Sequence, residues 1–174
     1  MGFWTPPTED VYKVNVDGSF VPEINHGSTC GVIRNFKGEV IAGFARPLPH
    51  CSSVEYAEAM ALLHGIDFAF DIGIQDLVVE GDCLHLISEI SSSHEDFSVV
   101  GHIVDEIKMG SVRFNSWACH HVRRSANGVA HELACFALAA PSDLFWMEFL
   151  PSRFQAALDR DSLTLGGRQC WWTS

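Results

Sequence analysis

The spacing of apolar residues changes near residue 53 from every second position to every third or fourth, and this change constrains the fold most. Apolar and polar residues alternate in "VYKVNVDGSF" (11–20), which predicts a strand. Two apolar runs around "NFKG" (35–38) predict a hairpin. Residues 53–71 have helical spacing, and Ser52 or Ser53 can cap that helix. The short apolar run of "DLVVEGD" (76–82) then predicts a buried parallel strand, reached by a right-handed crossover.

The rest of the chain continues this mixture of strands and helices. Helical patterns cover residues 83–91 and about 97–109, a strand pattern covers "VRFNSWACHHV" (112–122), and "SANGVAHELACFALAA" (125–140) forms the last helix of the domain. The order predicts an α/β domain over residues 11–140. We expect 1–10 to be a linker because of its prolines, and 141–174 to be a tail partly packed on the domain. Within that tail we expect a short helix around 151–160 and disorder over "GGRQCWWTS" (166–174).

Composition narrows the class of protein. No apolar run is long and uncharged enough to suggest a membrane span. Six scattered cysteines form no C-x-x-C pair, and no signal segment is visible, so we expect reduced thiols in an intracellular protein. The net charge of −11 argues against a typical nucleic-acid binder, because phosphate contacts favour basic surfaces. A site of carboxylates neutralised by bound cations is one way around this objection.

Three carboxylates occupy positions where chemistry can occur. Asp17 lies on the polar side of the first strand, Glu58 lies one turn into the first helix, and Asp82 lies at the carboxyl end of the fourth strand. If the first and fourth strands are neighbours, the three side chains converge. Converging carboxylates repel one another unless a cation lies between them, and hard oxygen ligands suit Mg²⁺. Two such ions about 3.5–4 Å apart can cleave a phosphodiester.

At this point the chain resembles a known family, the ribonuclease H type 1 family, and most of all its plant, reverse-transcriptase-associated branch. The resemblance rests on four ordered motifs, "KVNVDGS", "AEAMALLHGIDFAFDIG", "LVVEGDC" and "HVRRSANGVAHELA", within residues 12–140. It implies a mixed five-stranded sheet flanked by helices, in which three antiparallel strands precede the parallel ones. It also implies a retroelement-derived nuclease that uses Mg²⁺ or Mn²⁺ to hydrolyse the RNA strand of an RNA–DNA hybrid.

The resemblance assigns roles to particular residues. Asp17 would bridge two metal ions, Glu58 would bind one of them near a sugar hydroxyl of the substrate, and Asp82 would help to bind the other. The fourth acid of the family falls at His131, and Glu132 is a poor substitute because it points about 100° around the helix. Imidazole binds Mg²⁺ weakly, so we expect reduced activity or a shift toward Mn²⁺, with His131 as a proton carrier. We expect four residues to contact the substrate: Gly18, Ser19, Arg124 and Asn127.

Several alternatives stay open. Glu55 and Glu80 are rivals for the acidic roles, and His120, His121 and His131 could suggest a histidine metal cluster, although adjacent strand residues point to opposite faces. The main functional alternative is a catalytically degenerate domain that binds nucleic acid or protein, because a fold does not fix a function. Another nuclease or a transposase on the same fold is a third. We expect a monomer with no membrane association and no obvious protein partner.

Overall fold

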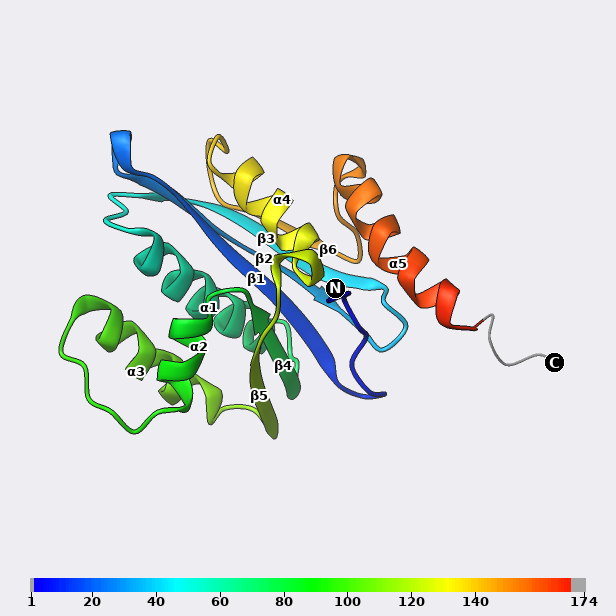
Figure 1. Ribbon diagram of the computed structural model, residues 1–174, viewed down its shortest axis with the longest axis horizontal. Helices are drawn as coiled ribbons and strands as arrows, with labels where there is room; N and C mark the ends of the chain where they lie inside the picture. Colours follow the sequence, from blue (N-terminus) through cyan, green and yellow to red (C-terminus); the bar gives the residue numbers. More distant parts are fainter. Residues whose placement is uncertain (1, 170–174) are drawn as a thin grey trace.

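A six-stranded mixed sheet lies at the centre of the structure, a computed structural model that describes residues 2–169 (Figure 1). The strands are β1 (Tyr12–Val21), β2 (His26–Arg34), β3 (Val40–Pro49), β4 (Asp76–Gly81), β5 (Ser116–His121) and β6 (Leu144–Met147). The helices are α1 (Val54–Asp71), α2 (Leu84–Ser91), α3 (Val99–Ser111), α4 (Gly128–Ala137) and α5 (Gln155–Gln169). Short 3₁₀ turns lie at Pro22–Ile24 (η1), Arg124–Ala126 (η2) and Ser152–Phe154 (η3). No helix within residues 2–169 is both long and apolar enough to cross a lipid bilayer.

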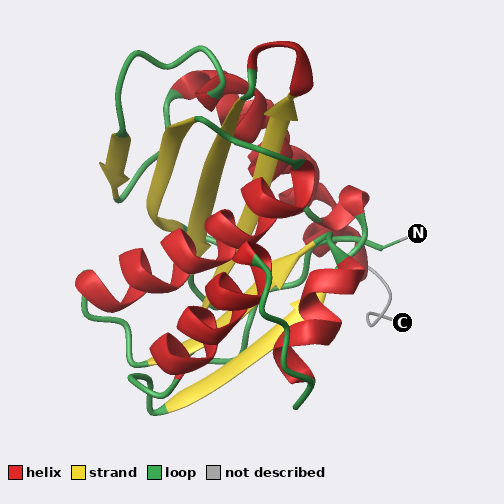
Figure 2. Cartoon of the chain, turned by 90° about the vertical axis from the view of Figure 1, so that its left-hand side faces the viewer, coloured by secondary structure: helices red, strands yellow, loops and turns green. Residues whose placement is uncertain are grey.

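The strands lie in the order β5-β4-β1-β2-β3-β6. β2 is antiparallel to β1 and β3, whereas β4 is parallel to β1 and to β5, as the sequence predicts. The direction of the strands changes across Figure 2 because the sheet is twisted. This order makes β1 and β4 neighbours, so the carboxyl-terminal part of β1 and the end of β4 lie together.

The prediction of five strands is wrong by one, because β6 pairs antiparallel with β3. This strand has only four residues, too few for a period of two to be recognised in the sequence. Phe145 packs against Phe68 of α1, with ring centroids 5.6 Å apart, while Trp146 packs against Phe136 of α4. Contacts with elements on both faces of the sheet therefore hold β6 in place.

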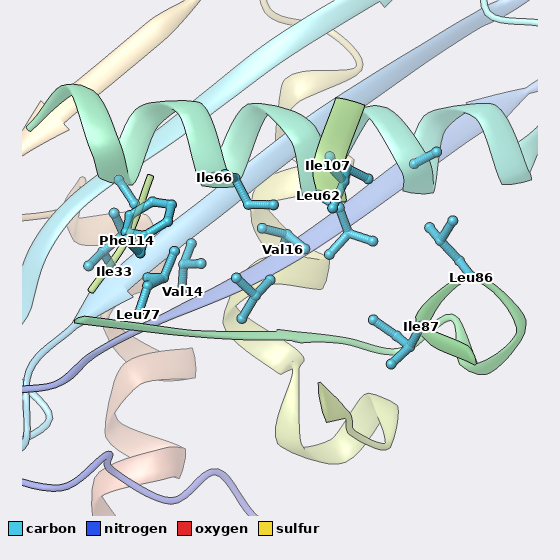
Figure 3. Packing of buried hydrophobic residues seen from close by; sticks show 14 of the residues in the cluster. Val14, Val16, Ile33, Leu62, Ile66, Leu77, Leu86, Ile87, Ile107 and Phe114 are labelled. Atoms are coloured by element: carbon cyan, nitrogen blue, oxygen red, sulfur yellow. The ribbon is translucent and has the colours of Figure 1, made fainter. Parts of the chain in front are cut away.

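The main core lies between the sheet and the helices α1 and α3. Apolar side chains of β1 and β4, such as Val14, Val16 and Leu77, meet Leu62 and Ile66 of α1 there (Figure 3). Alternation along β1 and helical spacing along α1 supply these side chains, so this layer follows directly from the sequence pattern. The helix begins where expected, since the Ser53 hydroxyl accepts a hydrogen bond from the backbone N–H of Tyr56 at 3.0 Å.

The opposite face of the sheet is covered by α4 and α5 (Figure 1). The helix expected around 151–160 is longer than predicted, because α5 runs from Gln155 to Gln169. The disorder predicted from residue 166 is therefore wrong for 166–169, and residues 170–174 lie outside the described part. Because helices cover this face as well, the polar side of β1 is buried, including Lys13, Asn15 and Asp17.

His64 of α1 makes the stability of the folded protein depend on pH. Its Nδ1 lies 2.8 Å from the Thr29 hydroxyl, and burial, aided by Arg46, lowers the pKa of the imidazole to about 4. The unfolded chain binds this proton near pH 6.5 and the folded protein only near pH 4, so between those values acid favours unfolding. We expect wild type to lose roughly 2–3 kcal/mol more stability than H64Q when the pH falls from 7 to 4. Urea unfolding of both proteins across this range measures the difference, and parallel stability curves would contradict it.

Candidate active site

The structure brings together the three carboxylates that the sequence singles out. Asp17 comes from β1, Glu58 from the second turn of α1, and Asp82 from the residue that follows β4. One oxygen of each lies within 4.8 Å of the others. Asp17 is 1% exposed and Glu58 is 8% exposed, so two of the three charges are withdrawn from water. Such a concentration of buried negative charge requires compensation by protons or cations.

Gly18 allows this convergence. A Cβ atom at Gly18 would lie 2.5 Å from the carbonyl carbon of Ala57 and 2.8 Å from the backbone nitrogen of Glu58. Any side chain would therefore push the start of α1 away from β1. The Gly18 backbone also hydrogen-bonds the Glu58 carboxyl. Gly18 acts here by its lack of a side chain, and Ser19 follows it on β1 as a half-buried residue.

The pKa values of Asp17 and Glu58 show that the cluster lacks enough compensating positive charge. Burial, then the nearby charge of Asp82, raises the pKa of Asp17; burial, then Asp17, raises the pKa of Glu58 to about 9. The oxygen Oδ1 of Asp17 is buried and has no N–H or hydroxyl donor among the described residues, and a hydrogen bond between the Asp17 and Glu58 carboxyls requires a proton on Glu58. An unpartnered carboxylate oxygen among hard oxygen donors fits a divalent cation such as Mg²⁺ or Mn²⁺. The residues present are therefore compatible with a metal centre.

His131 lies beside the carboxylates, at the position where the sequence resemblance predicts a fourth acid. Its Nδ1 is 3.1 Å from Oδ2 of Asp17, and its Nε2 is 3.4 Å from Nη1 of Arg124. Arg124 in turn donates from Nε to Oδ2 of Asp82 at 2.8 Å. Glu132 does not reach the cluster, because its carboxylate pairs with Arg160 at 2.6 Å. An open groove of about 630 Å³ begins at His131 and extends between α4 and the segment around Phe154.

Asn127 lies beneath the site, whereas the sequence suggests a contact with substrate. It is 1% exposed, its Nδ2 donates to the Val16 carbonyl at 2.9 Å, and its Oδ1 accepts from Asn15 at 3.1 Å. Both polar atoms of the amide are thus hydrogen-bonded within the protein. Asn127 fixes the start of α4 against β1, and in this way it positions His131 next to Asp17.

The rival acids lie elsewhere. Glu80 is buried and pairs with Lys13 at 3.1 Å, and Glu55 is exposed. Within residues 2–169, Asp17, Glu58 and Asp82 form the one group of three metal-ligating side chains close enough to share an ion, and His120 and His121 are exposed on β5. The five cysteines of the described part are free thiols, and burial raises the pKa of Cys83.

The mixed sheet, the crossover through α1 and the acidic cluster define a ribonuclease H-like domain. The chain belongs to the reverse transcriptase-like family, whose model matches residues 15–137. It is 25% identical over 162 residues to a protein of Arabidopsis thaliana that is named for ribonuclease H. That match covers 92% of this chain but 26% of the plant protein, so the chain spans about a quarter of the curated relative's length.

Solved structures support the fold. RNase H1 from Halobacterium salinarum superimposes with a TM-score of 0.68 at 20% identity, covering 74% of this chain and 97% of that one. LC11-RNase H1, isolated from compost and crystallised in complex with an RNA/DNA hybrid, gives a TM-score of 0.66 at 15% identity. It covers 73% of this chain and 96% of its own. β6 and α5 lie beyond the residues that the family model matches.

Proposed function

We propose that this domain is a metal-dependent endonuclease that hydrolyses the RNA strand of RNA–DNA hybrids. One observation carries the proposal: Asp17, Glu58 and Asp82 converge on a ribonuclease H-like fold with a buried Asp17 oxygen that no described residue satisfies. Stability does not explain this arrangement, because burying like charges together costs free energy. A retroelement origin fits the family to which the chain belongs.

The residues of the site have separate proposed roles. Asp17, Glu58 and Asp82 would hold Mg²⁺ or Mn²⁺. A bound ion would supply Lewis-acid stabilisation of the charge that develops on the phosphodiester. Glu58 enters the cluster from α1, and we propose that it faces the sugar of the scissile nucleotide. The imidazole of His131 is 38% exposed, and we propose that it carries a proton to or from the substrate.

The acidity of the chain shapes the expected binding. A net charge of −11 leaves few cations for phosphate contacts, and Arg124 is one beside the site. We propose that Ser19 and Arg124 contact the substrate backbone and that the groove beside His131 accepts part of the duplex. Binding should therefore be weak and should fall as salt is added.

The test is cleavage of end-labelled duplexes by wild type at low salt, with Mg²⁺ and Mn²⁺ in separate reactions. We expect cutting of the RNA strand in an RNA–DNA hybrid, and no cutting of duplex DNA or duplex RNA of the same sequence. A folded wild type that leaves the hybrid intact in both metals would contradict the proposal.

Filter binding of the same hybrid tests the second candidate function, a domain that binds nucleic acid without cutting it. His131 in place of an acid is the observation that favours that candidate.

His131→Asp should lower the Mg²⁺ concentration needed for half-maximal cleavage by about tenfold. The added carboxylate would lie beside Asp17, where it increases the negative charge that attracts the ion. Initial rates measured across a Mg²⁺ titration give the value. H120D is the matched control, because it adds the same charge at an exposed histidine of β5. An unchanged Mg²⁺ requirement in H131D would show that position 131 does not affect the metal centre.

A further inference from the structure

Arg124 lies inside the candidate active site as an internal cation. It is the first residue of η2, directly before α4, and its guanidinium bridges two sides of the acidic cluster. Nε donates to Oδ2 of Asp82 at 2.8 Å, and Nη1 lies 3.4 Å from Nε2 of His131. The imidazole continues the connection to Oδ2 of Asp17 at 3.1 Å. A continuous chain of polar contacts thus runs from Asp82 through Arg124 and His131 to Asp17.

The hydrogen-bond roles along this chain are mutually consistent. A guanidinium can only donate, so Nε2 of His131 accepts from Arg124. The proton of a neutral imidazole then lies on Nδ1, which donates to Oδ2 of Asp17. The chain satisfies one oxygen of Asp82 and one of Asp17. Oδ1 of Asp17 has no N–H or hydroxyl donor within residues 2–169, so it is free for a cation once Glu58 gives up its proton.

Charge balance then limits the number of metal ions. The sequence resemblance leads to an expectation of two divalent ions among four carboxylates, which is electrically neutral. This chain has three carboxylates and a guanidinium, which leave two negative charges, and one divalent ion neutralises them. A second ion would have to displace Arg124 from Asp82 and would face an imidazole, which is a poor ligand for Mg²⁺.

Arg124 is both paired and accessible. Its side chain is 61% exposed, whereas the Asp82 side chain that it pairs with is 10% exposed, so the guanidinium compensates a carboxylate largely withdrawn from water and still faces solvent. Its Nη2 donates to no described acceptor, so donors remain for an incoming anion. Guanidinium groups bind phosphate oxygens through such paired N–H donors.

We infer that the centre holds one divalent cation, between Asp17, Glu58 and Asp82, and that the Arg124 guanidinium takes the place of a second. In this arrangement Arg124 is fixed against Asp82 and presents its remaining N–H groups to the phosphate of the substrate. The inference rests on the proposed function and goes further, since it assigns to a side chain the second positive charge that two ions would otherwise provide.

Counting bound Mn²⁺ tests the inference without any cleavage assay. Free Mn²⁺ is measured by electron paramagnetic resonance during titration of wild type, R124A and R123A at low salt. R123A is the matched control, because it removes the same charge one residue away, at an exposed side chain with no ion pair in the described part. We expect one ion at the centre in wild type and R123A. In R124A we expect a second, more weakly bound ion, because Asp82 is then free of the guanidinium but three carboxylates do not fully neutralise two divalent ions. D17N supplies the background of surface sites to subtract.

The number of bound ions distinguishes failure of the one-ion centre from failure of the proposed nuclease activity. Two ions in wild type, or one ion in a folded R124A, would overturn the inference while leaving a metal-dependent nuclease in place. No ion at the centre in any of these proteins would remove the metal centre itself, and both the proposed function and the inference would fail. R124A leaves the 10% exposed Asp82 carboxylate without its cation, so thermal unfolding in the presence of Mn²⁺ is used to establish that the variant is folded before its ions are counted.

Discussion

Asp17→Asn is expected to reduce cleavage of an RNA–DNA hybrid by at least about 10³-fold while the protein stays folded. Asp17 is the most buried of the three carboxylates, and its Oδ1 is the oxygen without a hydrogen bond. Asparagine keeps the shape but removes the charge that attracts the cation, and its amide nitrogen cannot bind a metal. Single-turnover rates in Mg²⁺ and in Mn²⁺ measure the loss.

Two further measurements show whether the loss of cleavage is specific to the charge of Asp17. E55Q changes an exposed acid one turn before Glu58 on α1 and should cleave like wild type. In the absence of metal, D17N should be more stable than wild type, because burial and Asp82 raise the pKa of Asp17 and its ionisation works against folding. This gain should increase as the pH rises, since the folded wild type then gives up a proton that it retains at low pH. Hybrid cleavage by D17N at the wild-type rate would exclude Asp17 from the reaction.

Trp4→Ala is expected to destabilise the protein by about 3–5 kcal/mol. Trp4 is 1% exposed although it belongs to the amino-terminal segment without regular structure. Its indole Nε1 donates to Oδ1 of Asn15 at 2.9 Å, and the Arg34 guanidinium carbon lies 3.7 Å from its ring centroid. Arg34 is itself buried and pairs with Asp161 of α5 at 2.7 Å. Truncation would remove the indole from a desolvated charge network and leave a cavity over β1.

Urea unfolding measures this loss, and F3A is the matched control. Phe3 is the adjacent aromatic residue but is 51% exposed, so its truncation should change the stability by less than about 1 kcal/mol. Equal effects of W4A and F3A would show that the Trp4 network does not contribute to stability. Because Asn15 also hydrogen-bonds Asn127, W4A should additionally loosen α4, which can be followed by amide exchange at the start of that helix.

The parts of the fold that the sequence predicts are those encoded by local periodicity. β1 to β3, α1 and β4 each follow from a repeat of apolar residues, and their order dictates the crossover that brings Asp17 to Asp82. The missed parts depend on contacts between distant residues. β6 is fixed by pairing with β3, and the polar side of β1 is buried because α4, α5 and Trp4 cover it. No local pattern in "GFWTPPTED" distinguishes a packed segment from a linker.

In the candidate site, too, local pattern predicts some residues, whereas contacts between distant residues are missed. Asp17, Glu58 and Asp82 could be singled out because each lies at a defined point of a predicted element, and the structure places their oxygens together. The contact of Arg124 with Asp82 spans 42 residues, and nothing in the sequence distinguishes Arg124 from Arg123 in that respect. The asparagine in "SANGVAHELA" suggested a substrate contact, but its amide is used within the protein because α4 begins directly above Val16.

Anomalous diffraction from crystals of this domain soaked in Mn²⁺ would test most directly whether the three carboxylates form a metal centre. We predict an anomalous peak within bonding distance of Asp17, Glu58 and Asp82, and its absence from crystals of D17N soaked in the same way. Mn²⁺ bound at surface carboxylates of the same crystal, with no peak at this cluster, would contradict the metal centre and with it the proposed hydrolysis of RNA–DNA hybrids.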